Sequence, residues 1–516
     1  CISINLMKSH ATAILIKCIG FLAITGSALS ANPFDEPHLN ILPRTADETA
    51  RIVEVTKPTT TFSKAMRFEA SSAGAATAQV RRGADAFSQP SRNIRFEDRL
   101  NFNVGNGFFR KLWVSSPSST LASDGLGPVY NARSCHRCHI KNGRGHPPED
   151  KDTNSVSMLL RVSIPAPDDD SIAEIEGYIA SLPDPTYGSQ LQDFAVQGHR
   201  AEYRLDVRYS EEIIRLSDGE TVSLRHPNYR AGELGYGALH RDAMLSPRVA
   251  PQMIGLGLLE AIPAANILAL ADPQDRNGDG ISGRANTVWS VEYDQPMLGR
   301  FGLKAGSPTL RQQSASAFAG DIGISTPLFP NGAGDCSKAQ IACQKAPHGD
   351  QDPRGTEVDQ TGLDLVTFFS RNLAVPARRN PDDPNVLLGK EVFYTTGCTA
   401  CHQPNFVTHR LASQPEQSFQ LIWPYSDMLL HDLGEGLADN MPEARAMGRE
   451  WRTAPLWGIG LTKQVSGHSY FLHDGRARSL IEAVLWHGGE AKNQRDAVIE
   501  MPKTDRDALI TFLESL

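Results

Sequence analysis

The 516-residue sequence has no long run of basic residues, and its formal net charge is −8. A protein that binds nucleic acid needs a basic face to neutralise phosphates, so we expect no nucleic-acid partner. After residue 31 there is also no apolar segment of the roughly 20 residues that a membrane-spanning helix requires, so we expect no stable membrane span. The length exceeds that of one simple core and predicts two or three domains.

The N-terminal segment has the features of an export signal. Lys8 and Lys17 precede a short apolar stretch that ends in small residues near Ala28, Ser30 and Ala31. A basic start, an apolar core and a small-residue exit are typical of a secretory signal peptide. A membrane anchor is the alternative, but the apolar stretch is short for one. We expect a signal peptide over residues 1–31 and a periplasmic location.

Only eight cysteines are present, and Cys1 and Cys18 fall within the predicted signal. Four of the others form two C-x-x-C-H motifs. The remaining two, Cys336 and Cys343, lie in a stretch rich in Gly, Asp and Lys, without a histidine at ligand spacing. In an oxidising compartment we expect them to form a disulfide, and a free redox-active pair is the alternative.

The two C-x-x-C-H motifs are the most specific signal in the sequence. Two thiols at this spacing can add to the two vinyl groups of one haem, and the following histidine then reaches the iron. A zinc site would need a second C-x-x-C nearby, and a thioredoxin-like pair would need a βαβ context, which neither motif has. The sequence therefore predicts two covalently bound haem c groups, held by Cys135, Cys138, His139, Cys398, Cys401 and His402.

A faint internal repeat accompanies the motifs. Gly105 and Phe109 form a G-x-x-x-F pattern before the first motif, and Gly389 and Phe393 repeat it before the second. The separation from the aromatic residue to the first cysteine is much longer in the first copy, which indicates an insertion there.

The predicted fold class is mainly α, with two cytochrome c-like haem domains. The N-terminal domain is elaborated with long loops and a small β-hairpin over residues 200–226, whose turn is Ser217–Glu220. A linker rich in Pro, Asp and Arg ends at Pro384, which suits the first turn of a new helix. A capping box at Thr504 and Asp507 is expected to start the last helix. The expected parts are a signal peptide (1–31), a polar, weakly periodic lead-in (32–95), an N-terminal haem domain (96–375) and a C-terminal haem domain (376–516).

The sixth position of each iron decides what the haem can do. Ser479 and Glu482 form a capping box that starts a short helix, and His487 lies on its apolar face before two glycines. A lone histidine on such a face is usually a core residue, but in a haem domain we expect His487 to bind the second iron. For the first iron no ligand stands out among His146, His199, His226, His240, Met244 and Met253.

A third pattern lies between the motifs. Asp275, Asn277, Asp279 and Ile281 occupy alternate positions of a glycine-containing loop, as ligands of a hard cation do. The loop is not an EF-hand, because its twelfth position is Asn286. We expect a Ca²⁺ site here, and an Asx-rich turn without metal is the alternative.

Taken together, these residues resemble the di-haem oxidoreductase family, also described as "thiol oxidoreductase"-like, which is related to bacterial di-haem cytochrome c peroxidases and to MauG. The resemblance covers most of the mature chain. Its matching stretches are residues 124–128, 143–145, 255–262, 299–305, 317–321 and 471–490.

The resemblance implies roles for particular residues. In the peroxidases a His-Asp-Gly segment like that at His473 precedes a distal Met, and MauG has a Tyr at that place. Here the corresponding position is His487, which implies bis-histidine ligation of the second haem. The relatives use a Glu near the N-terminal haem as acid–base, and we expect Glu260 in that role. If Glu260 is buried its pKa should be raised, whereas a salt-bridged helix-end residue is the alternative.

We therefore expect a periplasmic di-haem oxidoreductase. The first haem would react with peroxide or another small oxidant, and the second would transfer electrons, either directly or through an intervening aromatic such as Trp289. The expected partner is a small redox protein, either a cytochrome or a cupredoxin. Alternatives are a pure electron-transfer cytochrome, a MauG-like oxidant of a protein partner, and a metal-handling protein whose haems only stabilise the fold.

Overall fold

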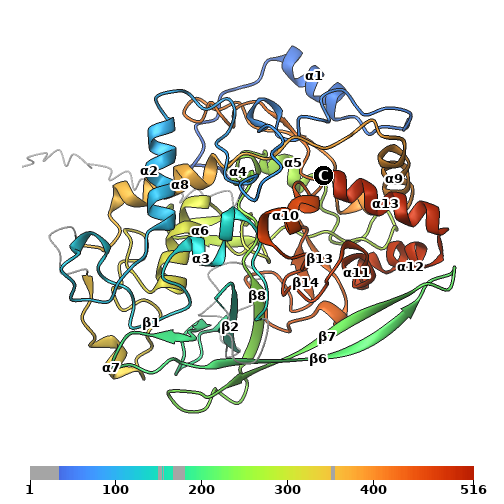
Figure 1. Ribbon diagram of the computed structural model, residues 1–516. Helices are drawn as coiled ribbons and strands as arrows, with labels where there is room; N and C mark the ends of the chain where they lie inside the picture. The colour runs from blue at the N-terminus through green and yellow to red at the C-terminus, as the bar shows by residue number, and fades with distance from the viewer. Residues whose placement is uncertain (1–33, 149–153, 155, 167–180, 350–354) are drawn as a thin grey trace, which may run out of the picture.

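A computed structural model describes residues 34–148, 154, 156–166, 181–349 and 355–516. The predicted signal peptide lies outside the described residues. Helix accounts for 29% and strand for 18% of the structure. The mainly α prediction is therefore right only in part, because small sheets and one long hairpin add to the helices (Figure 1). In the described part of the chain, no helix is long and apolar enough to cross a membrane.

Two pairs of packed helices form the framework of the fold. Helix α2 (Arg99–Arg110) packs on α8 (Gln360–Arg371), and α9 (Pro384–Thr395) packs on α13 (Lys503–Ser515). The remaining α-helices are α1 (Ala46–Thr56), α3 (Cys135–Cys138), α4 (Leu256–Glu260), α5 (Ala264–Leu268), α6 (Leu310–Ala317), α7 (Ile341–Gln344), α10 (Thr462–Ser466), α11 (Leu480–Leu485) and α12 (Lys492–Glu500).

The two helix pairs pack through the same residue types. A Cβ added to Gly105 of α2 would lie 2.1 Å from the carbonyl oxygen of Leu365 on α8. A Cβ added to Gly389 of α9 would lie 1.9 Å from the carbonyl oxygen of Ala508 on α13. Only glycine allows backbones to approach this closely. The G-x-x-x-F repeat in the sequence thus marks two equivalent helix crossings.

The starts of three helices can be compared with the predicted caps. Pro384 occupies the first turn of α9 and Asp383 caps it, as expected. Ser479 caps α11, but the Glu482 carboxylate accepts from the backbone of Arg478 rather than closing a full box. The box predicted at Thr504 is wrong, because α13 begins at Lys503 with Pro502 as its N-cap, so Thr504 lies inside the first turn.

A long antiparallel ribbon confirms the predicted hairpin and extends it. Strand β6 (Arg204–Arg215) pairs with β7 (Thr221–Gly232) along its whole length, around the turn at residues 217–220. In Figure 1 the ribbon runs along the bottom of the molecule toward α11 and α12. Contacts such as Ser217 N–H to the Ile499 carbonyl (3.0 Å) bind its tip to the C-terminal part.

The other strands are short. Strand β2 (Met158–Pro165) pairs with β3 (Ser181–Leu182), β4 (Gln190–Leu191) and β8 (Met244–Val249). Two-residue to four-residue pairs make the rest, namely β1 (Val129–Tyr130) with β5 (Phe194–Ala195), β9 (Thr287–Ser290) with β10 (Gln295–Leu298), β11 (Phe406–Val407) with β12 (Leu421–Ile422), and β13 (Leu430–Asp432) with β14 (Glu450–Arg452).

The described part of the lead-in, from residue 34, is more ordered than its weak periodicity predicts. Thr45 and Glu48 form a capping box at the start of α1, and Ile41 pairs with Leu411 in the C-terminal part. Packing against a distant segment thus orders residues whose own pattern is weak, because burial and pairing override local propensity.

A buried ion-pair cluster joins the lead-in to the predicted linker. The Glu69 carboxylate contacts the guanidinium of Arg378 and the ammonium of Lys390 (2.6 Å), and accepts from the Tyr425 hydroxyl at 3.2 Å. Burial alone would raise the pKa of Glu69, but the two cations lower it. The segment predicted as a linker is therefore packed rather than free.

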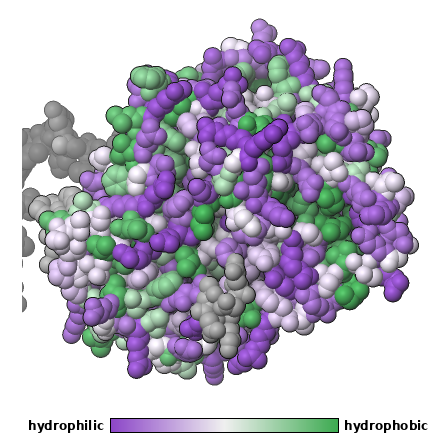
Figure 2. Space-filling view, in the orientation of Figure 1, coloured by the Kyte–Doolittle hydropathy of each residue, from purple (hydrophilic) through white to green (hydrophobic). Residues whose placement is uncertain are grey.

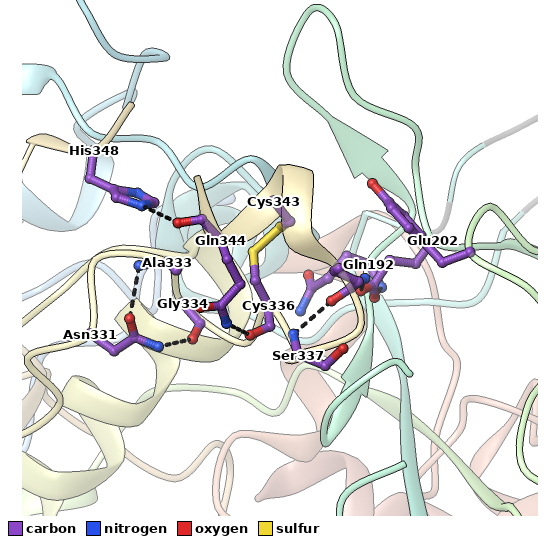
Figure 3. Close-up of a disulfide and its surroundings, with 12 residues drawn as sticks. Gln192, Glu202, Asn331, Ala333, Gly334, Cys336, Ser337, Cys343, Gln344 and His348 are labelled. Carbon is purple, nitrogen blue, oxygen red and sulfur yellow. Dashed lines mark hydrogen bonds between the residues drawn. A yellow bond between two sulfur atoms is a disulfide. The ribbon is translucent and has the colours of Figure 1, made fainter. Parts of the chain in front are cut away.

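The predicted disulfide is present. Cys336 and Cys343 are bonded, with their Cα atoms 5.9 Å apart (Figure 3). Gln344 donates from its side-chain amide to the Cys336 carbonyl. Beyond this loop lies Glu202, a buried carboxylate that accepts from the Gln340 side-chain amide and from the Gln192 N–H (2.8 Å).

Candidate haem-binding site

The two C-x-x-C-H motifs line one cavity. We call residues 135–139 the first motif and residues 398–402 the second motif. The cavity has a volume of about 940 Å³, near the upper end of the range for small-molecule sites. Segments far apart in the sequence therefore meet at one site. The predicted residues that line it are Cys135, Cys138, His139, Cys398, Cys401, His402 and His487.

The histidine of the first motif is oriented by the backbone. The Nδ1 atom of His139 lies 2.7 Å from the Pro251 carbonyl oxygen. A carbonyl oxygen only accepts, so Nδ1 carries the proton and the lone pair is left on Nε2. Burial lowers the pKa of His139 to about 4, which keeps the imidazole neutral at neutral pH. A neutral imidazole with a free Nε2 is the form that binds iron.

The second motif repeats this arrangement. His402 donates from Nδ1 to the Tyr425 carbonyl oxygen at 2.9 Å, and burial lowers its pKa to about 4. The phenylalanine of each G-x-x-x-F pattern packs near the histidine. The ring centroids are 6.2 Å apart for Phe109 and His139, and 6.1 Å apart for Phe393 and His402. The internal repeat thus extends from the helix crossings to the proximal histidines.

None of the four motif cysteines forms a disulfide. Burial raises the pKa of Cys135 and of Cys398 to about 12, so both thiols keep their protons. Cys138 donates from Sγ to the Val156 carbonyl at 2.8 Å. Both thiol pairs line the cavity, beside the space that a haem would fill.

His487 enters the cavity from the end of α11. Its Nδ1 atom donates to the Ala483 carbonyl at 2.8 Å, which leaves Nε2 free. Burial lowers the pKa of His402, the bond to Tyr425 opposes this effect, and nearby His487 lowers the pKa further. The two imidazoles are thus near neighbours, each with its lone pair on Nε2.

No equivalent residue emerges for the first motif. Of the six residues considered from the sequence, Met253 lines the cavity. It follows Pro251, whose carbonyl holds His139, by two residues. The structure does not bring the other five to the cavity wall, and these are His146, His199, His226, His240 and Met244.

Glu260 differs from the prediction. It is buried at the end of α4, where it accepts from the Leu310 N–H (2.8 Å) and from Arg371 Nε (3.1 Å). Burial favours a raised pKa, but Arg371 and His38 lower it below its usual value. The expected raised pKa is therefore wrong. Glu260 also does not line the cavity, so its contacts are those of a salt-bridged helix-end residue.

Asp321 is a carboxylate that the sequence argument passed over. It lies in a single π-helical turn, η5 (Phe318–Ile322), which follows α6 and lines the cavity. Such turns are frequent at functional sites. One carboxylate oxygen accepts from the Gln190 side-chain amide at 2.8 Å, and burial raises the pKa of Asp321. Its charge acts on both thiols of the first motif, Cys135 and Cys138.

The sequence contained a signal for Asp321. It is a single carboxylate in the run 317–321, which otherwise consists of small and aromatic residues. The same criterion selected Glu260, and the sequence could not show that Glu260 is hydrogen-bonded to a cation, Arg371, whereas Arg161 acts on Asp321 only through its charge.

Unpaired donors in the cavity wall fit the carboxylates of haem. The Nε atoms of Arg144 and Arg161 and the Nε2 atom of His473 are buried without a hydrogen-bond partner, and all three residues line the cavity. Buried polar atoms normally have partners. Haem propionates are carboxylates, and arginine is well suited to bind them. The donor set of the cavity therefore fits haem.

A charged histidine lies beside the second motif. His431 contacts Asp427 through Nε2 (2.8 Å) and Glu490 through Nδ1 (2.7 Å), and its Nδ1 is 3.5 Å from Cys401 Sγ. Burial disfavours its charge, but these partners raise the pKa of His431 well above its usual value. The cavity wall beside Cys401 thus holds an imidazolium.

The loop predicted to bind calcium is closed by its own hydrogen bonds. Asp275 accepts from the Gly280 N–H at 3.2 Å, and Asp279 accepts from the Ile281 N–H at 2.9 Å. Asn277 bonds Asp279 in turn. Within the described residues, no three or more His, Cys, Asp or Glu side chains are grouped to hold a metal ion. The geometry is that of an Asx-rich turn, and the calcium site stays a prediction.

Comparisons with known proteins place this site in a family. No curated protein matches the chain. Among solved structures, a chain of Kuenenia stuttgartiensis hydrazine synthase pressurised with xenon is similar at 18% identity over 36% of this chain and 63% of that chain. Its TM-score of 0.21 is too low to support an argument. A family model described as "Di-haem oxidoreductase, putative peroxidase" matches residues 67–516, which include both motifs and His487. The chain belongs to this di-haem oxidoreductase family, whose name implies two haems.

Proposed function

We propose that this protein is a periplasmic di-haem c-type oxidoreductase in which the first motif serves peroxide reduction and the second serves electron transfer. The observation that carries the proposal is an asymmetry within one cavity. His487 lines the cavity together with His402, whereas a half-buried carboxyl group, Asp321, accompanies the first motif. Two filled axial positions suit electron transfer, and an open position suits reaction with a small oxidant.

Six residues would hold the two haems covalently and at the proximal side, namely Cys135, Cys138, His139, Cys398, Cys401 and His402. A haem bound at the first motif with an open iron position would cleave the O–O bond of peroxide. In this reaction one H₂O₂, two electrons and two protons give two waters. His487 would occupy the sixth position at the second motif. Bis-histidine ligation lowers the potential of a haem relative to histidine–methionine ligation, which favours electron donation.

Asp321 is our candidate for moving the protons. Gln190 donates to one of its oxygens, which fixes the carboxyl group in the cavity wall. A carboxyl group with a raised pKa holds its proton to a higher pH and can deliver it to a leaving water. Glu260 lacks both properties, because Arg371 holds it ionised away from the cavity wall.

Electron transfer between the motifs would be shortened by an aromatic side chain. Trp451 and Trp457 line the cavity, whereas Trp289, suggested from the sequence, does not. Trp451 stacks on His473 with ring centroids 3.8 Å apart and donates from Nε1 to the Leu437 carbonyl at 2.8 Å. These contacts fix the position of the ring in the cavity wall.

One further feature supports the location. The Cys336–Cys343 disulfide is typical of an oxidising compartment. The electrons that peroxide reduction consumes would come from a small redox protein, such as a cytochrome or a cupredoxin.

Spectroscopy of the purified holoprotein tests the proposal. We expect electron paramagnetic resonance to show one low-spin and one high-spin ferric haem, and peroxide to change the high-spin signal. Replacement His487→Gly should convert the low-spin haem to high spin, and added imidazole should restore it. The matched control is His146→Gly, since His146 does not line the cavity.

Each result has a clear meaning. Two low-spin haems that do not respond to peroxide would identify an electron-transfer cytochrome instead. An unchanged spectrum in His487→Gly would show that His487 does not bind iron and is only a core residue.

A further inference from the structure

Strand β6 has one edge without a partner strand. It pairs with β7 along its whole length, and among the described residues these two strands form a sheet by themselves. Strand β7 lies against α11, and its Tyr229 hydroxyl donates to the Asp474 carboxylate at 2.8 Å. Strand β6 reaches the same part of the protein through a side-chain pair, Glu211 with Arg478 at 3.0 Å. The outer edge of the ribbon, which runs along the bottom of the molecule in Figure 1, therefore belongs to β6.

The hydrogen bonds of the ribbon show which backbone groups of β6 point away from β7. The Leu216 N–H donates to the Glu220 carbonyl at 2.8 Å, in the register of the strand pairs. Bonded and non-bonded pairs alternate along an antiparallel ladder, so the odd-numbered residues of β6 point their N–H and C=O groups outward. Pro227, which has no N–H, lies opposite Tyr209 and fits a non-bonded position. From the described residues, no hydrogen bond reaches the outward groups of residues 205–215.

Exposed side chains of opposite charge lie along this edge. On one face of β6 the Arg208 side chain is 74% exposed and the Glu212 side chain is 56% exposed. Their partners are also on the ribbon, with Asp206 at 3.2 Å from Arg208 and His226 at 2.7 Å from Glu212. Charges on an edge strand usually prevent a second strand from pairing with it. Here the two signs lie symmetrically on either side of Ser210, so the edge is complementary to itself.

An apolar side chain is exposed on the other face of the strand. Ile213 is 62% exposed near the tip of the ribbon. In the view of Figure 2, hydrophilic residues along the lower edge of the molecule are mixed with small apolar groups. A single exposed apolar residue is ordinary in a soluble protein. A second β6 strand, antiparallel and centred on Ser210, would however place its Val207 opposite Ile213 and cover it.

We infer that two copies of this protein form a symmetric dimer, in which their β6 strands pair antiparallel about a two-fold axis at Ser210. This axis places Arg208 of each copy opposite Glu212 of the other. An axis at Tyr209 would instead place Asp206 opposite Glu212, two like charges. Backbone hydrogen bonds between the two edges supply affinity, and the side-chain pairs fix the register. The two ribbons join into one continuous sheet, and the inference does not depend on the proposed function.

Sedimentation velocity of the purified holoprotein, over a range of protein concentrations, measures the association. We expect an equilibrium between monomer and dimer. Arg208→Glu puts like charges opposite each other at two places, so the dissociation constant should rise about tenfold. Adding Glu212→Arg exchanges both signs and should bring the constant back to within about threefold of the wild type. The control Arg241→Glu makes the same change of charge on the connection between β7 and β8, where the side chain is 88% exposed, and should leave the constant unchanged.

A substitution in the backbone tests the pairing of the edges directly. Ile213→Pro removes an N–H that points away from β7, so the ribbon itself should persist, as far-ultraviolet circular dichroism can check. The dissociation constant should rise at least about tenfold, because the lost donor occurs twice in the dimer and the proline ring blocks the edge. Ile213→Ala keeps the N–H and should have a smaller effect. If Ile213→Pro does not fold, the exchange of charges at Arg208 and Glu212 decides the question.

A cross-link locates the axis. In Ser210→Cys the two new thiols lie opposite each other in a non-bonded pair, whose Cα atoms are about 4.5 Å apart and within reach of a disulfide. Oxidation with diamide should therefore yield a covalent dimer on a non-reducing gel. The control Asp206→Cys lies on the same face of β6, but the axis holds its two copies too far apart to be joined.

Two results would overturn the inference. One is a wild-type holoprotein that stays monomeric at every concentration. The other is a dimer whose dissociation constant is unchanged in Ile213→Pro and which gives no cross-link in Ser210→Cys, since its interface would then lie elsewhere. Loss of peroxide reactivity has no bearing on either result.

Discussion

The two motifs share a scaffold on their proximal side. In each, a glycine lets two helices cross closely, a phenylalanine packs near the proximal histidine, and a backbone carbonyl fixes the Nδ1 proton of that histidine. The matching distances show that the same local solution occurs twice in one chain. The differences between the two sites must therefore lie in what surrounds this common scaffold.

The buried carboxylates around the two motifs differ in their partners. On the side of the first motif, burial raises the pKa of Asp321 and Asp335, and raises that of Glu202 to about 8. On the side of the second motif, burial is outweighed by cations. Arg378 and Lys390 lower the pKa of Glu69, and neighbours that include Arg476 (2.8 Å) lower that of Asp474.

This difference separates two kinds of chemistry. An acid that burial affects more strongly than any cation has a raised pKa, so it holds its proton to a higher pH and can exchange it. A buried acid held between cations stays ionised and cannot serve as a proton source. The surroundings of the first motif therefore suit proton-coupled reduction, and those of the second suit transfer of electrons alone. Glu260 shows why the partner matters. Its position in the sequence suggested an acid with a raised pKa, but its ion pair with Arg371 makes it one of the acids that stay ionised.

The largest predicted effect concerns Asp321. The variant Asp321→Asn keeps the size of the side chain and its acceptor for Gln190 but removes the proton. We expect the rate of reaction with peroxide to fall about 10²-fold to 10⁴-fold, the usual contribution of a positioned acid–base group. Stopped-flow absorbance after mixing with peroxide, between pH 5 and 8, gives the rate.

The matched control is Glu202→Gln. Glu202 also has a raised pKa, but it does not line the cavity, so its amide should leave the peroxide rate within about twofold. Equal losses in both variants would assign the effect to general destabilisation. A loss in Glu260→Gln that exceeds the loss in Asp321→Asn would restore the original expectation.

An intermediate effect is predicted for the two helix crossings. The variants Gly105→Ala and Gly389→Ala should each lower the free energy of unfolding by about 1–3 kcal/mol, because the added methyl group meets a backbone carbonyl. Urea unfolding, followed by circular dichroism, measures both. Similar losses would show that the two crossings are equivalent in energy as well as in geometry.

Gly107 provides the control on the same helix. A Cβ added at Gly107 would meet nothing within 4 Å. Gly107→Ala should therefore be neutral or stabilise the protein by up to about 1 kcal/mol through helix propensity. Destabilisation of Gly107→Ala as large as that of Gly105→Ala would mean that α2 depends on its glycines for a reason other than close packing.

Local patterns in the sequence predicted much of this arrangement. The C-x-x-C-H spacing, the G-x-x-x-F repeat, the hairpin turn, the cap of α9 and the disulfide all depend on residues that are close in the chain. The short helix before His487 and its cap at Ser479 were predicted for the same reason, although α11 ends at Leu485 and His487 lies just beyond its C-cap, Trp486. Each of these features is set by short-range geometry that the sequence states directly.

Contacts between residues that are distant in the sequence could not be predicted from local patterns. The residues near Glu260 in the sequence do not predict its ion pair with Arg371. The lead-in likewise gives no local sign of its contact with the segment after residue 376. Whether a buried acid is protonated depends on such distant partners. The order of the lead-in, the role of Asp321 and the electrostatic contrast between the motifs therefore required the fold.

The smallest predicted effect concerns stability and pH, and it tests the contrast between the two groups of acids. Burial raises the pKa of Glu202 to about 8 from 4.5. Below pH 4.5 the folded and unfolded chains both hold this proton, so its stabilising effect is complete. Between about pH 4.5 and 8 only the folded chain holds it, so stability falls by at most about 1.4 kcal/mol for each pH unit. Glu202→Gln should remove this slope, so its stability relative to the wild type should rise as the pH rises toward 8. Urea midpoints at pH 5, 6, 7 and 8 measure the difference between the two proteins.

Glu69→Gln should instead lose stability without a change of slope in this window, because the lowered pKa of Glu69 keeps it ionised throughout. Parallel curves for Glu202→Gln and the wild type would mean that Glu202 is ionised in the folded protein, and the acids around the first motif would then no longer differ from those around the second.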